Sequence, residues 1–159
     1  MDTTTQKIMF SSKSDEWGTP EDFFHKLNRR YKFTLDPCSS HKNKKCQSYY
    51  TIEDDGLTKD WGNERVFVNP PYGDIKKWVE KSYRAAQEGA FVVMLIPART
   101  DTKYWHDYVM KSSRVYFVKG RLKFDNGSEK KNAAPFPSAV VVFGEMCWGP
   151  SPVIQTIER

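Results

Sequence analysis

Three strand-like apolar stretches constrain the fold of this chain more than any other feature. Each of them is followed by polar residues or prolines. They cover residues 33–35, 66–68 and 90–96, and the last is apolar throughout. Continuously apolar strands are typical of mainly parallel sheets covered on both faces. In such sheets ligands bind beyond the carboxyl ends of the strands. One rim would then carry Asp36-Pro37, Asn69-Pro70-Pro71-Tyr72 and Pro97-Ala98-Arg99.

Helical periodicity occurs in three places around these strands. A first helix is predicted over about 20–30, because the Thr19 hydroxyl can cap free N–H groups and proline is tolerated in a first helical turn. A second is predicted over 74–88, where Gly89 is a natural C-cap, and a third over about 101–110. The alternation of strands and helices predicts an α/β fold with a mainly parallel sheet.

Two further apolar stretches, 114–118 and 138–143, have no helical pattern between them. We therefore expect these two strands to form an antiparallel pair at one edge of the sheet. Residues 15–149 are predicted to form a single domain. Residues 1–14 are expected to be a flexible arm, and residues 150–159 a short extension packed on the surface.

Composition narrows the class of protein. A length of 159 residues suits one domain, and no stretch is apolar enough to span a bilayer. An odd number of cysteines, three, indicates reduced thiols in a cytosol. With 25 Lys+Arg against 20 Asp+Glu, the net charge of +5 permits a polyanionic partner without requiring one.

The segment Asn69-Pro70-Pro71-Tyr72 carries the clearest chemical signal. Its prolines lack N–H donors and fix φ, which leaves the Asn69 amide oxygen and the Pro70 carbonyl as directed acceptors. Two such acceptors can bind both hydrogens of one –NH₂ group, and Tyr72 offers a face on which a planar ring can stack. The segment predicts a planar substrate with an exocyclic amine or amide, the alternative being an ordinary strand-ending turn.

The same segment is similar to the catalytic motif of S-adenosylmethionine-dependent amino methyltransferases. Over about residues 15–145 the chain resembles the small phage-type Dam-like DNA N6-adenine methyltransferases. The resemblance implies a minimal Rossmann-like class I methyltransferase fold, S-adenosylmethionine as cofactor, adenine-containing DNA as partner, and the cytoplasm of a bacterium or phage-infected cell. It rests on these further segments: Glu16-Trp17-Gly18-Thr19-Pro20, Leu35-Asp36-Pro37-Cys38, Asp55-Gly56-Leu57 with Asp60-Trp61, and Leu95-Ile96-Pro97-Ala98-Arg99-Thr100.

The resemblance also implies residue roles. Asp36 matches an acid that contacts the methionine portion of the cofactor, and Asp55 an acid near its adenine, with Glu53, Asp54 and Asp60 as competitors. One departure is that residues 37–43 replace the usual glycine-rich turn. The implied catalytic residues are Asn69, Pro70, Pro71 and Tyr72, and the implied cofactor-binding residues are Trp17, Thr19, Pro20, Asp36, Pro37, Cys38, Asp55 and Asn69.

Adenine chemistry gives this site a mechanism. The N6 lone pair is delocalised into the ring, so acceptors on both N6 hydrogens would push the nitrogen toward tetrahedral geometry and aim its lone pair at the methyl group. Transfer would be an in-line displacement that needs positioning but no metal or strong base. Because N6 is inaccessible inside a duplex, the adenine would flip out and stack on Tyr72.

Basic residues near the predicted rim are candidates for DNA contact, although a solvated surface would also be rich in lysine. The insertion over 125–132 is the candidate for base recognition. Arg99 could contact substrate or form a structural ion pair. The candidate DNA-binding residues are Tyr72, Arg99, Lys119, Arg121, Lys123, Lys130 and Lys131.

Other interpretations remain open at this level. Cys38, His41 and Cys46 have a zinc-like spacing but lack a convincing fourth ligand, so free thiols are favoured. The substrate could instead be RNA adenine or a protein glutamine, or the chain could be a non-catalytic DNA-binding module with a methyltransferase-like shell. We expect a monomer or a weak homodimer.

Overall fold

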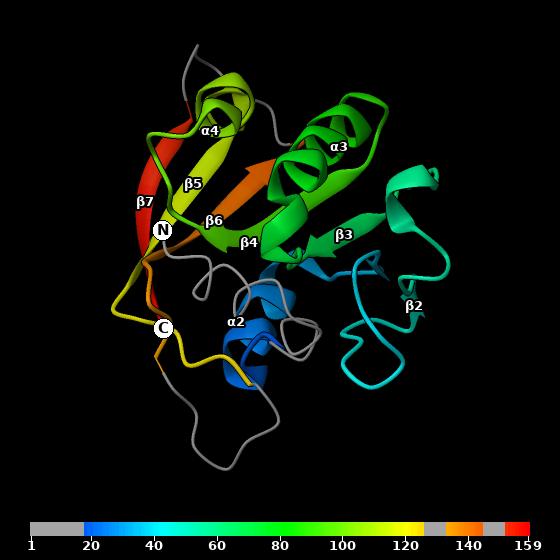
Figure 1. Ribbon diagram of the computed structural model, residues 1–159, viewed down its shortest axis with the longest axis horizontal. Helices are drawn as coiled ribbons and strands as arrows, with labels where there is room; N and C mark the ends of the chain where they lie inside the picture. Colours follow the sequence, from blue (N-terminus) through cyan, green and yellow to red (C-terminus); the bar gives the residue numbers. More distant parts are fainter. Residues whose placement is uncertain (1–17, 126–132, 145–151) are drawn as a thin grey trace.

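The computed structural model describes residues 18–125, 133–144 and 152–159. These residues form a seven-stranded sheet in the order β2-β1-β3-β4-β6-β5-β7, with helices on both faces (Figure 1). The strands are β1 Leu35–Asp36, β2 Ser48–Tyr49, β3 Arg65–Val68, β4 Phe91–Pro97, β5 Arg114–Lys119, β6 Ser138–Phe143 and β7 Val153–Glu158. The helices are α2 Glu21–Tyr31, α3 Ile75–Gln87 and α4 Lys103–Asp107, with 3₁₀ turns at Gly56–Thr58, Tyr72–Asp74 and Val109–Lys111.

The sheet is mainly parallel, as predicted. Strand β6 runs antiparallel to both of its neighbours, β4 and β5, and the other pairings are parallel. The antiparallel pair of β5 and β6 is confirmed, but its place at the edge is wrong. The edge strand on this side of the sheet is β7, which pairs in parallel with β5 from Arg114 opposite Val153 to Lys119 opposite Glu158.

Strand β7 also changes the interpretation of residues 150–159. The extension that we expected on the surface contributes its residues 153–158 to the sheet itself. Sequence reasoning missed this strand because its side chains are mostly polar or exposed, with Val153 52% and Ile154 51% accessible. Of its six residues Ile157 alone packs against a core, so the strand shows no alternation of buried and exposed positions that would reveal it.

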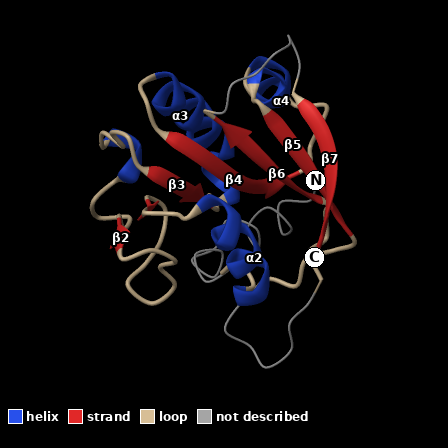
Figure 2. Ribbon diagram, turned by 180° about the vertical axis from the view of Figure 1, so that it is seen from behind, coloured by secondary structure: helices blue, strands red, loops and turns tan. Residues whose placement is uncertain are grey.

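Each face of the sheet supports its own apolar core. Val66, Val68 and Met94 point toward α3 and α4, whereas Phe67 and Val93 point toward α2. Figures 1 and 2 show α3 and α4 side by side on one face and α2 on the other. Burial on both faces explains why β3 and β4 are continuously apolar, as the sequence indicated.

The start of α2 differs from expectation. The helix buries Phe23, Phe24 and Leu27 as predicted, but no side chain caps its N-terminus. The Thr19 hydroxyl, which we expected to cap it, instead accepts a hydrogen bond from Asn69, at the end of β3. The predicted third helix over 101–110 is also shorter, since it divides into α4 and the 3₁₀ turn Val109–Lys111.

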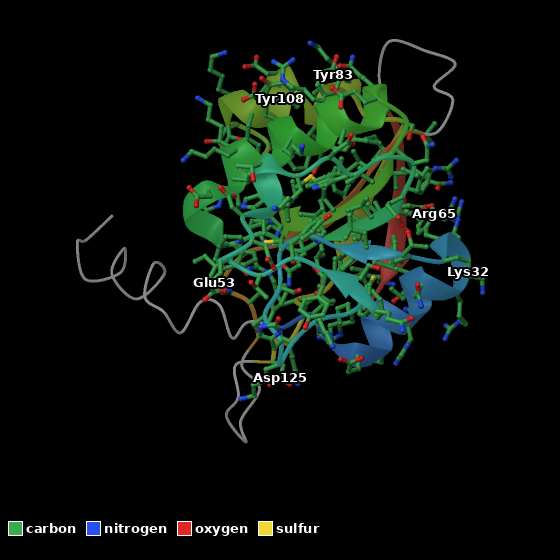
Figure 3. All side chains as sticks on the ribbon, turned by 90° about the vertical axis from the view of Figure 1, so that its right-hand side faces the viewer. Lys32, Glu53, Arg65, Tyr83, Tyr108 and Asp125 are labelled. Atoms are coloured by element: carbon green, nitrogen blue, oxygen red, sulfur yellow. The ribbon has the colours of Figure 1, made fainter. Side chains whose placement is uncertain are left out.

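Two connections frame the functional region. The parallel strands β1 and β2 are joined by residues 37–47, which contain no helix. Beyond β5, residues 122–125 and 133–136 run beside each other, with a bridge between Lys123 and Ala133, and we call these two segments the stem. A second bridge joins Asp125 of the stem to Gly18. Figure 3 shows Glu53 at the left of the molecule, Asp125 at its lower edge, and Lys32 and Arg65 at the right.

Candidate active site

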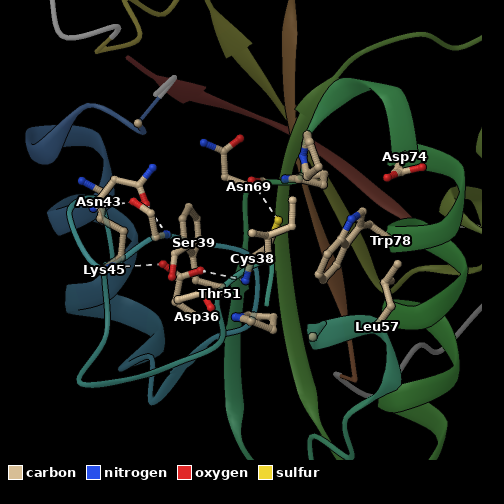
Figure 4. A pocket seen from close by; sticks show the side chains of 18 of the residues that line it. Asp36, Cys38, Ser39, Asn43, Lys45, Thr51, Leu57, Asn69, Asp74 and Trp78 are labelled. Carbon is tan, nitrogen blue, oxygen red and sulfur yellow. Dashed lines mark hydrogen bonds between the residues drawn. The ribbon is translucent and has the colours of Figure 1, made fainter. Parts of the chain in front are cut away.

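A pocket of about 350 Å³ opens at the carboxyl ends of β1 and β3 (Figure 4). This volume lies within the range of roughly 300–1,000 Å³ that is common for small-molecule sites. Pro20 does not line it, and Trp17 lies outside the described residues. The residues predicted for catalysis or cofactor binding that do line it are Thr19, Asp36, Pro37, Cys38, Asp55, Asn69, Pro70, Pro71 and Tyr72.

Asn69 lines the pocket and contacts two neighbouring segments of the chain. Its Nδ2 donates to Thr19 Oγ1 over 3.0 Å, and its backbone carbonyl lies 3.6 Å from the Cys38 thiol (Figure 4). Thr19 precedes α2, and Cys38 belongs to the loop that follows β1. The end of β3 is therefore fixed to both neighbouring segments.

The two prolines shape the backbone beyond Asn69. The Pro71 carbonyl accepts the N–H of Asp74 over 3.2 Å, and this bond accompanies the 3₁₀ turn Tyr72–Asp74. Among the described residues none donates a hydrogen bond to the Pro70 carbonyl. That carbonyl is therefore an acceptor in the pocket wall that remains available to a ligand.

Tyr72 is half-buried and packs between the two cores. Its ring meets the Phe136 ring of the stem edge-on, with the centroids 5.1 Å apart. Burial raises the pKa of the Tyr72 phenol, and the positive charge of Arg99 opposes this shift only in part. The phenol is thus neutral at physiological pH, which suits a stacking surface better than a general base.

Asp36 secures the opposite wall of the pocket. The side chain is 3% exposed, and its two oxygens accept the N–H groups of Cys38 at 3.3 Å and Lys45 at 3.0 Å. Burial raises the pKa of this carboxyl to about 6, although the two N–H donors favour the charged form. The carboxyl therefore holds the helix-free loop against the end of β1.

The acidic run after β2 separates into distinct environments. Asp54 accepts bonds from the Thr51 N–H and hydroxyl at 2.9 and 3.0 Å, and it does not line the pocket. Glu53 and Asp55 do line it, whereas Asp60 does not. The competition left open by the sequence is thereby narrowed to Glu53 and Asp55.

Gly56 is a site residue whose importance sequence reasoning missed. A Cβ at this position would lie 2.1 Å from the Pro37 carbonyl oxygen, so only glycine lets the acidic run approach the loop after β1. The Gly56 carbonyl accepts the Trp61 indole N–H over 3.0 Å. The glycine that the chain lacks directly after β1 is thus present where another segment crosses it.

The apolar wall of the pocket was also unexpected. Leu57 and Trp78 line it, and Trp78 is 6% exposed on the buried side of α3. Helical spacing identifies Trp78 as a core residue but not as a pocket residue. Ile52, which is 79% exposed, lies at the pocket as well.

Four of the predicted DNA-binding cations are among the described residues, and none of these four lines the pocket: Arg99, Lys119, Arg121 and Lys123. Arg99 is partly buried, its charge acts on the Tyr72 phenol, and its guanidinium forms no hydrogen bond or ion pair within the described ranges. Arg121 and Lys123 line a second concavity beside Pro20, and Lys119 pairs with Glu158 at 3.5 Å. Lys130 and Lys131 fall in 126–132, outside the described residues.

Two features are absent from residues 18–125, 133–144 and 152–159. No group of three or more His, Cys, Asp and Glu side chains is placed to hold a metal ion, so Cys38, His41 and Cys46 are not gathered into such a group. No helix there has the length and apolar content to cross a membrane.

The sequence is similar to a known family and to proteins of two phages. The family model described as DNA N-6-adenine-methyltransferase (Dam) matches residues 6–159. The chain is 30% identical over 118 residues to the DNA N-6-adenine-methyltransferase of Escherichia phage T1, covering 72% of this chain but only 50% of that protein. It is 30% identical over 139 residues to the DNA N-6-adenine-methyltransferase of Haemophilus phage HP1, covering 83% and 80%.

A solved structure is similar in fold. A class I S-adenosylmethionine-dependent methyltransferase from Listeria monocytogenes superposes with a TM-score of 0.56 over 96% of this chain and 69% of that one. The two sequences are 10% identical, so the likeness concerns the fold. The α/β sheet described above is accordingly a class I methyltransferase fold.

Proposed function

The chain belongs to the DNA N-6-adenine-methyltransferase (Dam) family, and from that premise we propose that it transfers a methyl group from S-adenosylmethionine to N6 of an adenine in DNA. The observation that carries the proposal is the placement of Asn69-Pro70-Pro71-Tyr72 on the wall of the 350 Å³ pocket. Two carbonyl-type oxygens and an aromatic ring are what an exocyclic amine on a planar base requires.

The loop after β1 and the acidic run after β2 suit the cofactor. S-adenosylmethionine, when bound, supplies a methyl group that its sulfonium has already activated. Asp36 is a buried carboxylate above pH 6 and would favour the positive charges of the methionine portion. Leu57 and Trp78 offer an apolar wall for a purine, beside the carboxylates of Glu53 and Asp55.

The segment after β3 suits the target base. Asn69 and the Pro70 carbonyl would accept the two N6 hydrogens, and the Tyr72 ring would stack on the flipped adenine. Holding the amine in line with the methyl group can contribute on the order of 7–11 kcal/mol to lowering the barrier. The methylated N6 would lose one proton to water. Because the Tyr72 phenol stays neutral, Tyr72 would act by positioning the base and not by accepting that proton.

Cations outside the pocket suit the DNA backbone. Arg99 has no ion-pair partner among the described residues and lies near Tyr72, which supports a contact with a phosphate close to the flipped nucleotide. Arg121 and Lys123 lie beside the start of α2 and would contact phosphates farther away.

Labelled S-adenosylmethionine tests the proposal. The protein is incubated separately with DNA, with RNA and with a glutamine-bearing protein, and the product of each is digested and separated. Label in N6-methyladenine from DNA supports the proposal. Label only in RNA or protein, or a failure to bind the cofactor, would overturn it.

A further inference from the structure

Thr19 connects the start of α2 to the end of β3, and the function proposed above leaves this contact without a role. The Thr19 side chain is 2% exposed, and its Oγ1 accepts Asn69 Nδ2 over 3.0 Å. We propose that Thr19 is a positioning residue that fixes the side-chain amide of Asn69 for reaction. The inference rests on the proposed function and assigns Thr19 to Asn69, whereas the family resemblance assigned it to the cofactor.

The Thr19 hydroxyl does not cap the helix that it precedes. A threonine before a helix usually caps free N–H groups, but α2 begins at Glu21 with no side-chain cap. A hydroxyl buried this completely costs free energy unless it has a partner. Its described partner is Asn69, so the burial of Thr19 is compensated at the catalytic segment and not at the helix.

The two ends of the Asn69 side-chain amide differ in what they can bind. Only the oxygen of Asn69 can accept an N6 hydrogen of adenine, and a rotated amide would set its own NH₂ group against that of the base. While Nδ2 is engaged by Thr19, the oxygen is the end turned away from it. The contact therefore favours the orientation in which Asn69 can act.

Thr19 is itself held in place by backbone hydrogen bonds between its neighbour and the stem. Its neighbour Gly18 donates its N–H to the Asp125 carbonyl over 2.8 Å and accepts the Asp125 N–H over 3.0 Å. Phe136 of the same stem packs against Tyr72. The stem thus contacts both ends of the catalytic segment, Asn69 through Gly18 and Thr19, and Tyr72 directly.

The closing experiment uses the full chain and separates three quantities. Wild type, Thr19→Val and Thr19→Ser are compared for the dissociation constant of S-adenosylmethionine, that of DNA, and the single-turnover rate of methyl transfer with both saturating. Valine keeps the shape but removes the acceptor, so we expect the rate to fall about tenfold while both dissociation constants stay within about twofold. Serine restores the acceptor, and its rate should recover to within about threefold of wild type.

Two outcomes would overturn the inference. One is a Thr19→Val rate equal to that of wild type. The other is a weakened cofactor affinity with an unchanged saturated rate, which would make Thr19 a cofactor ligand. If wild type itself transfers no label to DNA, the proposed function fails first, and that failure is distinct.

A second pair of variants covers the case in which Thr19→Val does not fold. Gly18→Pro removes the N–H that bonds Asp125, whereas Gly18→Ala keeps it and adds a Cβ whose nearest neighbour is 3.9 Å away. The proline variant should lose about tenfold more of the single-turnover rate than the alanine variant. Equal rates for the two would contradict the role of the Gly18 bridge in holding Thr19.

Discussion

The two walls of the pocket are built by different means. The wall after β3 is stiff because of its own covalent structure, since two prolines fix the backbone between Asn69 and Tyr72. The wall after β1 is a loop without a helix, and the buried Asp36 carboxyl holds it by hydrogen bonds to Cys38 and Lys45. The first wall owes its rigidity to residues that are adjacent in the sequence. The second depends on one buried carboxyl group, that of Asp36, which the fold brings against the loop.

The largest expected effect is on the methyl-transfer rate and comes from a substitution in the wall after β3. Asn69→Ala should lower the methyl-transfer rate by about a thousandfold, because one of the two acceptors for the amine is lost where charge develops. The dissociation constant of S-adenosylmethionine should stay within about threefold, since the wall after β1 is untouched. Single-turnover transfer and calorimetric binding measure the two quantities, and a variant with near-normal turnover would exclude the proposed mechanism.

The next effect is a dependence of stability on pH, which we expect from Asp36 in the wall after β1. In the folded chain Asp36 keeps its proton up to about pH 6, whereas its ordinary pKa is 3.8. The folded state binds more protons in this interval, so the Asp36 contribution to the free energy of unfolding falls as pH rises through it. At about 1.4 kcal/mol per pKa unit, the loss is about 3 kcal/mol.

Urea unfolding of wild type and Asp36→Asn at several values between pH 4 and 7 measures this contribution. The wild-type free energy of unfolding should decline relative to that of the variant as pH rises. Parallel curves would show that Asp36 does not titrate in this window. Affinity for S-adenosylmethionine should change in the opposite sense, weakening in wild type below pH 6 as Asp36 gains its proton, while the variant stays insensitive to pH.

A smaller effect concerns Tyr72 at the far end of the stiff wall. Tyr72→Ala should weaken methyl transfer by about 10- to 100-fold, since base stacking on an aromatic ring contributes roughly 1–3 kcal/mol. Tyr72→Phe keeps the ring and should retain most of the rate, because the phenol is neutral and donates no charge to the reaction. Rates of both variants from pH 6 to 9 provide the check, and a phenylalanine variant as slow as the alanine variant would assign a role to the hydroxyl.

The smallest effect lies outside both walls. Arg99→Gln should weaken DNA binding by only a few-fold and reduce the slope of log affinity against log salt by about one, because one phosphate contact is lost. Arg84→Gln is the matched control, since Arg84 is not among the candidate DNA-binding residues and pairs with Glu80 at 3.0 Å in α3. Equal slopes for wild type and Arg99→Gln between 50 and 200 mM salt would remove Arg99 from the interface.

The walls after β3 and after β1 also differ in how far the sequence predicts them. The segment after β3 could be identified because a buried strand and two prolines lie next to each other in the chain. The partners of Asn69 could not, since Thr19 is fifty positions away and its place before a helix indicates a cap. The close approach of Gly56 to Pro37 is equally invisible, because it depends on how the acidic run crosses the loop after β1.

The strands of the sheet differ likewise in how well the sequence predicts them. Strands β3 and β4 are buried on both faces, and their apolar runs reveal them. Strand β2 has two residues and β7 is mostly exposed. Backbone pairing with a neighbour holds them, so no buried apolar run marks them, although β7 contains β-branched residues that strands favour.

The bridge between Gly18 and Asp125 has a consequence for the order in which the chain is completed. A chain emerging from the ribosome already carries Thr19, Asp36 and Asn69 when its first half has been made. The stem that holds Gly18 comes from the second half, after β5. A nascent chain that ends before the stem would therefore contain every recognisable motif and still lack the bridge to Gly18 that we propose holds Thr19 against Asn69.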